Sequence, residues 1–150
     1  MYKRPNALAS YGKMANAETN PLKQIVMLYD GAIKFLHLTA ADIENGDLIA
    51  KAEHSNRAFD ILNYLQSILD FERGGDSAVI LDNLYTRISA LVLRASAELD
   101  PKLMRLSADL LMPVRDAWNT NAQNALAAQT PPPPVVLDNS AAAATIKMSA

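Results

Sequence analysis

The sequence predicts an all-α protein: an antiparallel up-down-up-down four-helix bundle with a flexible N-terminal arm and a disordered C-terminal tail rich in Pro and Ala. Apolar residues recur at steps of three and four through most of the chain, which is the period of an amphipathic helix. Glycines and capping residues interrupt this pattern and leave links of only a few residues. Because so short a link cannot return the chain to the end it left, consecutive helices are expected to run antiparallel.

The first helix is predicted over about residues 21–45. Asn20 can cap the free amides of the first turn, and Pro21 suits the first helical position, where a backbone N–H would have no partner. Gly46 supplies the left-handed conformation that commonly ends a helix. The stripe expected to face the core consists of Leu22, Ile25, Tyr29, Ile33, Leu36, Ala40 and Ile43.

Three more helices are predicted, over about residues 47–73, 77–99 and 101–126. The double glycine at 74–75 closes the first of the three, and Asp100 followed by proline repeats the capping signal before the last. The residues expected to face the core are Leu48, Ala52, Phe59, Leu62, Leu65 and Leu69, then Ile80, Leu84, Ile88, Leu91, Ala95 and Leu99, then Leu103, Leu106, Leu110, Val114 and Ala117.

The chain is expected to form one domain between two tails. Residues 1–18 are small and polar with scattered apolar side chains, and we expect a flexible arm. Residues 19–127 hold the helical pattern and form the predicted bundle. Residues 128–150 contain a four-proline run and then small residues, a composition typical of a stiff spacer followed by disorder.

Composition excludes several classes of function. The formal charge of -2 disfavours nucleic acid as a partner, because binding to phosphate needs a basic surface. The chain has no cysteine, which removes disulfides and thiolate chemistry and suits a reducing cytoplasm. Neither a secretion signal nor a long apolar run is present, so we expect a cytoplasmic protein with no membrane insertion.

We find no residue set that predicts catalysis, a metal site or a cofactor. The Glu-x-x-His step of di-metal bundles is missing, and His37 and His54 are interpreted as part of solvated helix faces. Gly74 and Gly75 lack the preceding strand and the lysine of a phosphate-binding loop. The sequence therefore predicts no catalytic residue, no cofactor and no enzyme.

A second apolar line runs beside the core stripe of the first helix, and it consists of Met27, Gly31, Phe35 and Leu38. Glycine inside a helix costs about 1 kcal/mol relative to alanine, so Gly31 indicates the close approach of another backbone or a bulky side chain. The other helices carry similar additional residues, which are Tyr64, Ile68 and Phe71, then Leu81, Tyr85 and Val92, then Leu111 and Trp118.

Two interpretations of this additional apolar surface stay open. In the structural interpretation it is a wide core face, or it is covered by the arm through Leu8 and Tyr11; in the functional interpretation it is a set of grooves for an amphipathic partner. Periodicity alone leads only to a helical bundle that binds another helical chain.

A resemblance to the flagellin-specific export chaperone family FliS rests on three ordered segments, ANAETNPLKQIVMLYDGAIKFL, LQSILDFERGGDSAVILDNLYTRI and LLMPVRDAWN. It spans about residues 8–124, and MLYDGA at 27–32 is its most specific part. Gln24, Asp76 and Ser77 depart from the residues usual in the family, and none of them belongs to the core stripe.

The resemblance implies a small cytoplasmic bundle without cofactor that binds the C-terminal segment of new flagellin as helices along its surface. It also implies an N-terminal lid over this surface and a further partner, the membrane export gate of the flagellar apparatus. The residues expected in the lid and the flagellin contact are Leu8, Tyr11, Met27, Gly31, Phe35, Leu38, Tyr64, Ile68, Phe71, Tyr85 and Trp118. Without its client the protein is expected to be a monomer or weak dimer; the alternative is a homo-oligomer or adaptor with no flagellin client.

Overall fold

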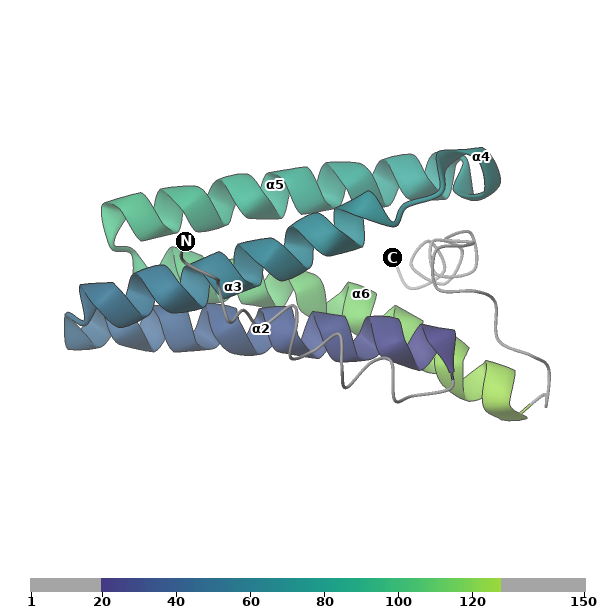
Figure 1. The fold of residues 1–150 in the computed structure, drawn as a ribbon, viewed down its shortest axis with the longest axis horizontal. Coiled ribbons are helices and arrows are strands. Elements are labelled where there is room, and N and C mark those ends of the chain that lie inside the picture. The colour runs from purple at the N-terminus through teal and green to yellow at the C-terminus, as the bar shows by residue number, and fades with distance from the viewer. Residues whose placement is uncertain (1–19, 128–150) are drawn as a thin grey trace, which may run out of the picture.

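The computed structural model describes residues 20–127, and every regular element within them is a helix. The helices are α2 (Pro21–Asn45), α3 (Leu48–Ser67), α4 (Phe71–Gly74), α5 (Asp76–Glu98) and α6 (Pro101–Ala127). The four long helices form an antiparallel bundle in which α2 packs against α3 and α6, and α5 packs less extensively against the same two neighbours (Figure 1). The predicted all-α class is confirmed, whereas the predicted arm and tail lie outside the described residues.

The start of α2 is fixed by Asn20. Its side-chain oxygen accepts hydrogen bonds from the backbone N–H groups of Leu22 at 3.0 Å and Lys23 at 3.4 Å, as a helix N-cap does. Its amide nitrogen donates to the carbonyl of Ala122 at 3.3 Å, which joins the first turn of α2 to the last part of α6. At the other end Gly46 has a φ of 71°, the left-handed conformation expected of a glycine C-cap.

The predicted second helix over 47–73 is wrong as a single element, because the structure divides it into α3 and α4. Asp70 has an extended backbone, and its carboxylate accepts hydrogen bonds from the backbone N–H groups of Glu72 at 3.1 Å and Arg73 at 3.0 Å. An aspartate in this conformation starts a new helix, so the old one must end before it. The sequence contained this capping signal at Asp70, but the apolar period running past it concealed it.

The core stripe predicted for α2 is confirmed: six of its seven members are buried, and the seventh, Ile43, packs partly buried against the core. The stripes of the other helices are partly wrong, because several members are exposed, namely Leu48, Ala52, Ile80, Leu99, Leu106 and Leu110. Core positions are occupied instead by Leu81, Tyr85, Val92, Leu111 and Trp118. These helices carry apolar residues around much of their circumference. Two rows of apolar residues, about 100° apart around the helix axis, therefore both show steps of three and four, and the spacing alone does not tell which row faces the core.

Polar side chains define which flank of each helix meets which neighbour. Gln66 in α3 donates to the carboxylate of Asp82 in α5 at 2.7 Å, and the Lys51 ammonium donates to the Ser96 carbonyl at 3.1 Å. On the opposite side of the bundle, the guanidinium of Arg115 in α6 donates to Asp30 in α2 at 2.8 Å. Arg105 in α6 forms a further ion pair with Glu44 in α2.

Candidate partner-binding surface

Phe35 lies where α2 meets α3. Its ring stacks on the imidazole of His54 with centroids 5.9 Å apart, and the Arg57 guanidinium lies 5.6 Å from the ring centroid. His54 is held by Asp42, whose carboxylate oxygen is 2.6 Å from the ring Nδ1. Phe35 is buried, so in this conformation its ring is covered rather than presented to a partner.

The same antiparallel register extends to the other residues predicted on α2. Because α2 and α3 run antiparallel, Gly31 and Met27, which precede Phe35 in α2, lie beside the part of α3 that follows Arg57 and leads to Tyr64. Gly31 is buried, Met27 is partly buried, and Tyr64 is 37% exposed. The predicted α2 and α3 residues therefore lie along one helix junction. The buried position of Gly31 agrees with the close approach expected at an internal glycine.

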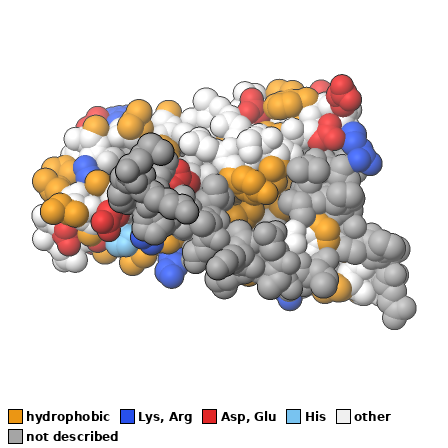
Figure 2. Space-filling model, in the orientation of Figure 1, with side chains coloured by type: hydrophobic (Ala, Val, Ile, Leu, Met, Phe, Trp, Pro, Cys, Tyr) orange, Lys and Arg blue, Asp and Glu red, His pale blue; other side chains and the backbone are white. Residues whose placement is uncertain are grey.

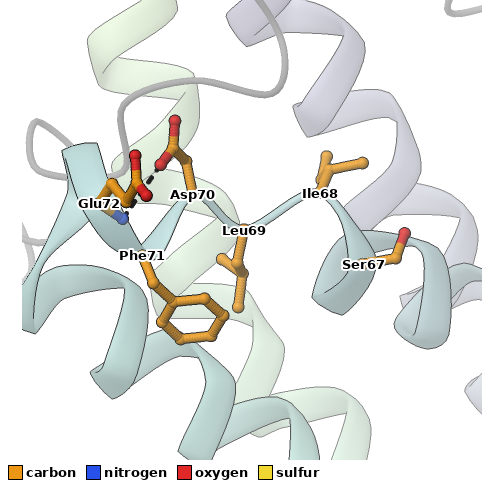
Figure 3. A pocket seen from close by; sticks show the side chains of 6 residues that line it. All are labelled: Ser67, Ile68, Leu69, Asp70, Phe71 and Glu72. Atoms are coloured by element: carbon orange, nitrogen blue, oxygen red, sulfur yellow. Dashed lines mark hydrogen bonds between the residues drawn. The ribbon is translucent and has the colours of Figure 1, made fainter.

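A pocket of about 440 Å³ lies at the connection between α3 and α4 (Figure 3). It is lined by Ser67, Ile68, Leu69, Asp70, Phe71 and Glu72. Two of the predicted contact residues, Ile68 and Phe71, belong to it, and Phe71 is 50% exposed. Figure 3 shows the side chains of Leu69 and Phe71 pointing to one side of the connection and Asp70 to the other. The break after α3 therefore places the side chains of Leu69 and Phe71 on one side of the connection, an arrangement that a continuous helix would not give.

Tyr85 and Trp118 lie in the core, so the structure does not place them on a surface. The hydroxyl of Tyr85 forms a hydrogen bond with that of Tyr29, and the two rings lie 6.2 Å apart. Burial raises the pKa of Tyr29 well above its ordinary value, and the neighbouring Tyr85 hydroxyl raises it further. Burial also raises the pKa of Tyr85. Trp118 lies close enough to lower the pKa of Tyr29 slightly, without a hydrogen bond of ordinary geometry from its indole nitrogen.

Of the remaining predicted residues, Leu38 is partly buried in α2, and Leu8 and Tyr11 lie outside the described residues. The prediction that these residues contact a partner is not tested by their positions. It therefore stays a prediction.

Sequence reasoning missed an apolar line between α5 and α6, since it assigned these residues to the core. We call this line the α5–α6 seam; it consists of Ile80, Leu84, Leu91, Leu103, Leu106 and Leu110. Asp82 and Ser96 lie on the flank of α5 that meets α3, which leaves the opposite flank, with Ile80 and Leu84, toward α6. In α6 the flank that carries Arg105 meets α2, so Leu106 lies on the flank toward α5.

A smaller apolar group lies at the end of the bundle where α2 passes into α3, toward the left of Figure 2. Leu48 and Ile49 lie in the first turn of α3 and are 52% and 78% exposed. Leu99, the residue after α5, is also exposed at this end and has a positive φ of 53°.

Residues 20–127 contain no group of three or more acidic or histidine side chains arranged to hold a metal ion. In the same range, no helix is both long and apolar enough to cross a membrane. What the described bundle does offer is apolar surface along its helix junctions, which is the kind of surface that protein-binding modules use. The described residues therefore form a helical bundle with exposed apolar side chains along part of its surface.

Comparison with known proteins identifies the family. Residues 4–125 match the sequence model of the family described as "Flagellar protein FliS". The chain is 32% identical to the "Flagellar secretion chaperone FliS" of Vibrio cholerae over 67% of this chain and 74% of that protein. It is 34% identical to the Salmonella typhimurium protein of the same name, over 66% of this chain and 74% of the relative. It is 28% identical to the Campylobacter jejuni protein of the same name, over 82% of this chain and 96% of the relative.

The chain belongs to the FliS family of flagellar secretion chaperones. This is a family of chaperones rather than of enzymes, and the resemblance stated from the sequence is confirmed.

Proposed function

We propose that this chain is a cytoplasmic export chaperone that binds the C-terminal helical segment of flagellin. In this role it prevents premature polymerisation and supports delivery of flagellin to the flagellar type III export apparatus, including its membrane export gate. Membership of the FliS family supports the role in flagellar secretion. The observation that carries the binding function is the α5–α6 seam, where Leu106 is 47% exposed and Leu110 is 39% exposed.

The physical task needs no covalent chemistry. The terminal helices of a filament subunit are apolar on one face, and covering that face keeps the subunit from assembling. If the client buries about 1,500 to 3,000 Å² and becomes ordered at the same time, the ordering offsets several kcal/mol of the contact energy. The resulting complex holds the client and still releases it at the export apparatus.

Calorimetry with a flagellin peptide tests the proposal. A peptide covering about the last 40 residues of flagellin from the same organism, disordered alone, is titrated into the full chain with circular dichroism alongside. We expect one-to-one binding, a negative heat-capacity change and more helix than the two components have separately. The absence of binding at high micromolar concentration would refute the proposal.

A second candidate function is homo-oligomerisation through the same exposed leucines. It predicts a dimer or larger assembly at micromolar concentration without any client, which light scattering detects. A monomer without client, together with peptide binding, would exclude it.

A further inference from the structure

We infer that the pocket at the α3–α4 connection binds the C-terminal tail of this same chain, through the apolar residues Val135, Val136 and Leu137. The tail lies outside the described residues, and the contact is one that covers the exposed ring of Phe71. The inference does not rest on the proposed function, because no client takes part in it. It also gives a role to the proline run at 131–134, which the proposed function does not use.

The pocket is an apolar site that the described bundle leaves uncovered. Its volume of about 440 Å³ lies within the range of about 300 to 1,000 Å³ that is usual for ligand sites. The ring of Phe71 is 50% exposed, and Ile68 is only partly buried, whereas Leu69 already packs against the core. Aliphatic side chains laid against Phe71 and Ile68 would therefore remove apolar surface from water.

The tail leaves the bundle at the same end as this pocket. The helices α5 and α6 are antiparallel and are joined by residues 99–100. Because α6 has 27 residues and α5 has 23, the end of α6 reaches beyond the start of α5, which directly follows α4. Figure 1 shows α4 and the end of α6 at the same end of the bundle, on the right.

The length of the proline-rich segment is sufficient to reach the pocket. The helix α6 packs against α2 and α5 and lies diagonally opposite α3, and neighbouring helices about 8 to 10 Å apart give a diagonal of about 13 Å. Residues 128–134 separate α6 from Val135, and at about 3.1 Å per residue in the polyproline II conformation these residues span about 22 Å. A linker only slightly longer than the distance between its sites gives an effective concentration in the millimolar range, so a weak apolar contact is sufficient for docking.

Residues 135–137 suit the pocket in shape and in charge. They form the only run of three branched aliphatic residues in 128–150, and β-branched valine favours the extended backbone that the preceding prolines begin. The rim of the pocket is net acidic, since Asp70, Glu72 and Asp76 outnumber the single basic residue of segment 67–76, which is arginine 73 in the sequence. Residues 128–137 carry no charge, so the acidic rim does not oppose their binding.

The N-terminal arm is the rival occupant, because residues 1–19 join α2 at this end of the bundle. Lys3, Arg4 and Lys13 make the arm basic, so its binding to an acidic rim would weaken as salt rises. An apolar contact of residues 135–137 would not weaken in this way. We favour the tail because its apolar residues are contiguous, whereas those of the arm are scattered along it.

Paramagnetic relaxation in the full-length chain tests the contact. Because the sequence has no cysteine, Ser140→Cys supplies a single site for a nitroxide label, which broadens the NMR signals of backbone amides near it. Val136→Asp places a charge in the proposed contact, and Ile146→Asp makes a matched change further along the tail. On the bundle, Phe71→Ala removes the ring, and Ile49→Ala is its control at the opposite end, where Ile49 is 78% exposed.

We expect the label to broaden the amide signals of residues 67–72. The paramagnetic relaxation rate there should fall by about threefold or more in Val136→Asp and in Phe71→Ala, because a carboxylate is opposed by the apolar pocket and the loss of the ring removes apolar contact. Ile146→Asp and Ile49→Ala should leave the rate within about 1.5-fold of the original. Raising the salt concentration from about 50 to about 500 mM should not lower it. If circular dichroism shows that Phe71→Ala is unfolded, Ile68→Ala replaces it.

Each other outcome overturns the inference. Equal broadening with Val136→Asp would mean that the tail passes the pocket without binding it. Amide signals of residues 67–72 that shift with salt and with Leu8→Asp, but not with Val136→Asp, would assign the pocket to the arm. Broadening between a nitroxide-labelled chain and a separate isotope-labelled chain would assign the contact to a second copy. No client is present, so each of these results leaves the proposed function untouched.

Discussion

Replacing the hydroxyl of Tyr85 tests how the core of the bundle tolerates its polar pair. In Tyr85→Phe the hydroxyl of Tyr29, which is fully buried, loses its hydrogen-bond partner. Leaving a buried hydroxyl unsatisfied costs about 1 to 3 kcal/mol, so we expect the free energy of unfolding to fall by that amount. For a chain of this size the melting temperature should fall by about 2 to 4 °C per kcal/mol.

The double variant Tyr29→Phe/Tyr85→Phe should be closer to the unmodified protein than the sum of the single variants predicts. With both hydroxyls removed, no unsatisfied hydroxyl remains, and the replacement is nearly neutral. The expected interaction energy is about 1 to 3 kcal/mol, obtained from a double-mutant cycle.

Urea unfolding followed by tryptophan fluorescence measures these changes. Trp118 is the only tryptophan in the sequence and is 1% exposed, so its emission reports the opening of the core near the tyrosine pair. Circular dichroism gives an independent measure of the helices. Tyr64→Phe, at an exposed position, is the control and should change the free energy of unfolding by less than about 0.5 kcal/mol. Additive single-variant costs would refute the reasoning.

Three further predictions concern pH and the helix ends. Because folding raises the pKa values of Tyr29 and Tyr85, their contribution to the free energy of unfolding is fully present below the unfolded tyrosine pKa near 10. Above that pH the free energy of unfolding should fall by about 1.4 kcal/mol per pH unit for each residue. Alkaline unfolding monitored by circular dichroism should therefore begin at a higher pH in the double Phe variant. Asp70→Ala removes the α4 cap and should cost about 1 kcal/mol in urea unfolding, whereas Asp70→Asn should retain most of the stability. Leu99 has a left-handed backbone, which glycine adopts without strain, so Leu99→Gly should raise the free energy of unfolding by about 0.5 to 1 kcal/mol and raise the melting temperature with it. Leu99→Ala should raise neither.

The start and end of α2 were predictable from the sequence because their signals are local. Asn20 with a following proline, and Gly46 after the last turn, each act within a few residues and do not depend on the neighbouring helices. The signal for the break at Asp70 is also local. The helix was nevertheless predicted to continue through it, because apolar residues recur at helical spacing both before and after Asp70. The division of the chain into arm, bundle and tail stays a prediction, since the proposed arm and tail lie outside the described residues.

The assignment of apolar residues to core or surface was not predictable for α5 and α6. Leu81 and Ile80 are equally apolar neighbours, and only the positions of α3 and α6 decide which of them is buried. The same ambiguity led to Tyr85 and Trp118 being assigned to the partner surface, although both lie inside the bundle. On α2 the predicted line beside the core stripe is divided, because Met27 and Leu38 are partly buried whereas Gly31 and Phe35 are buried.

The hydrogen bond from Asn20 to Ala122 has a mechanical consequence. It lies where the described chain enters α2 and where α6 approaches its end, so a force pulling these two points apart acts across the α2–α6 pair at one end. When two antiparallel helices are pulled apart at one end, the force acts first on the contacts of the end turn. Each following turn is loaded only after the contacts of the turn before it have broken. The interface between α2 and α6, although the most extensive in the bundle, should therefore open at low force from this end.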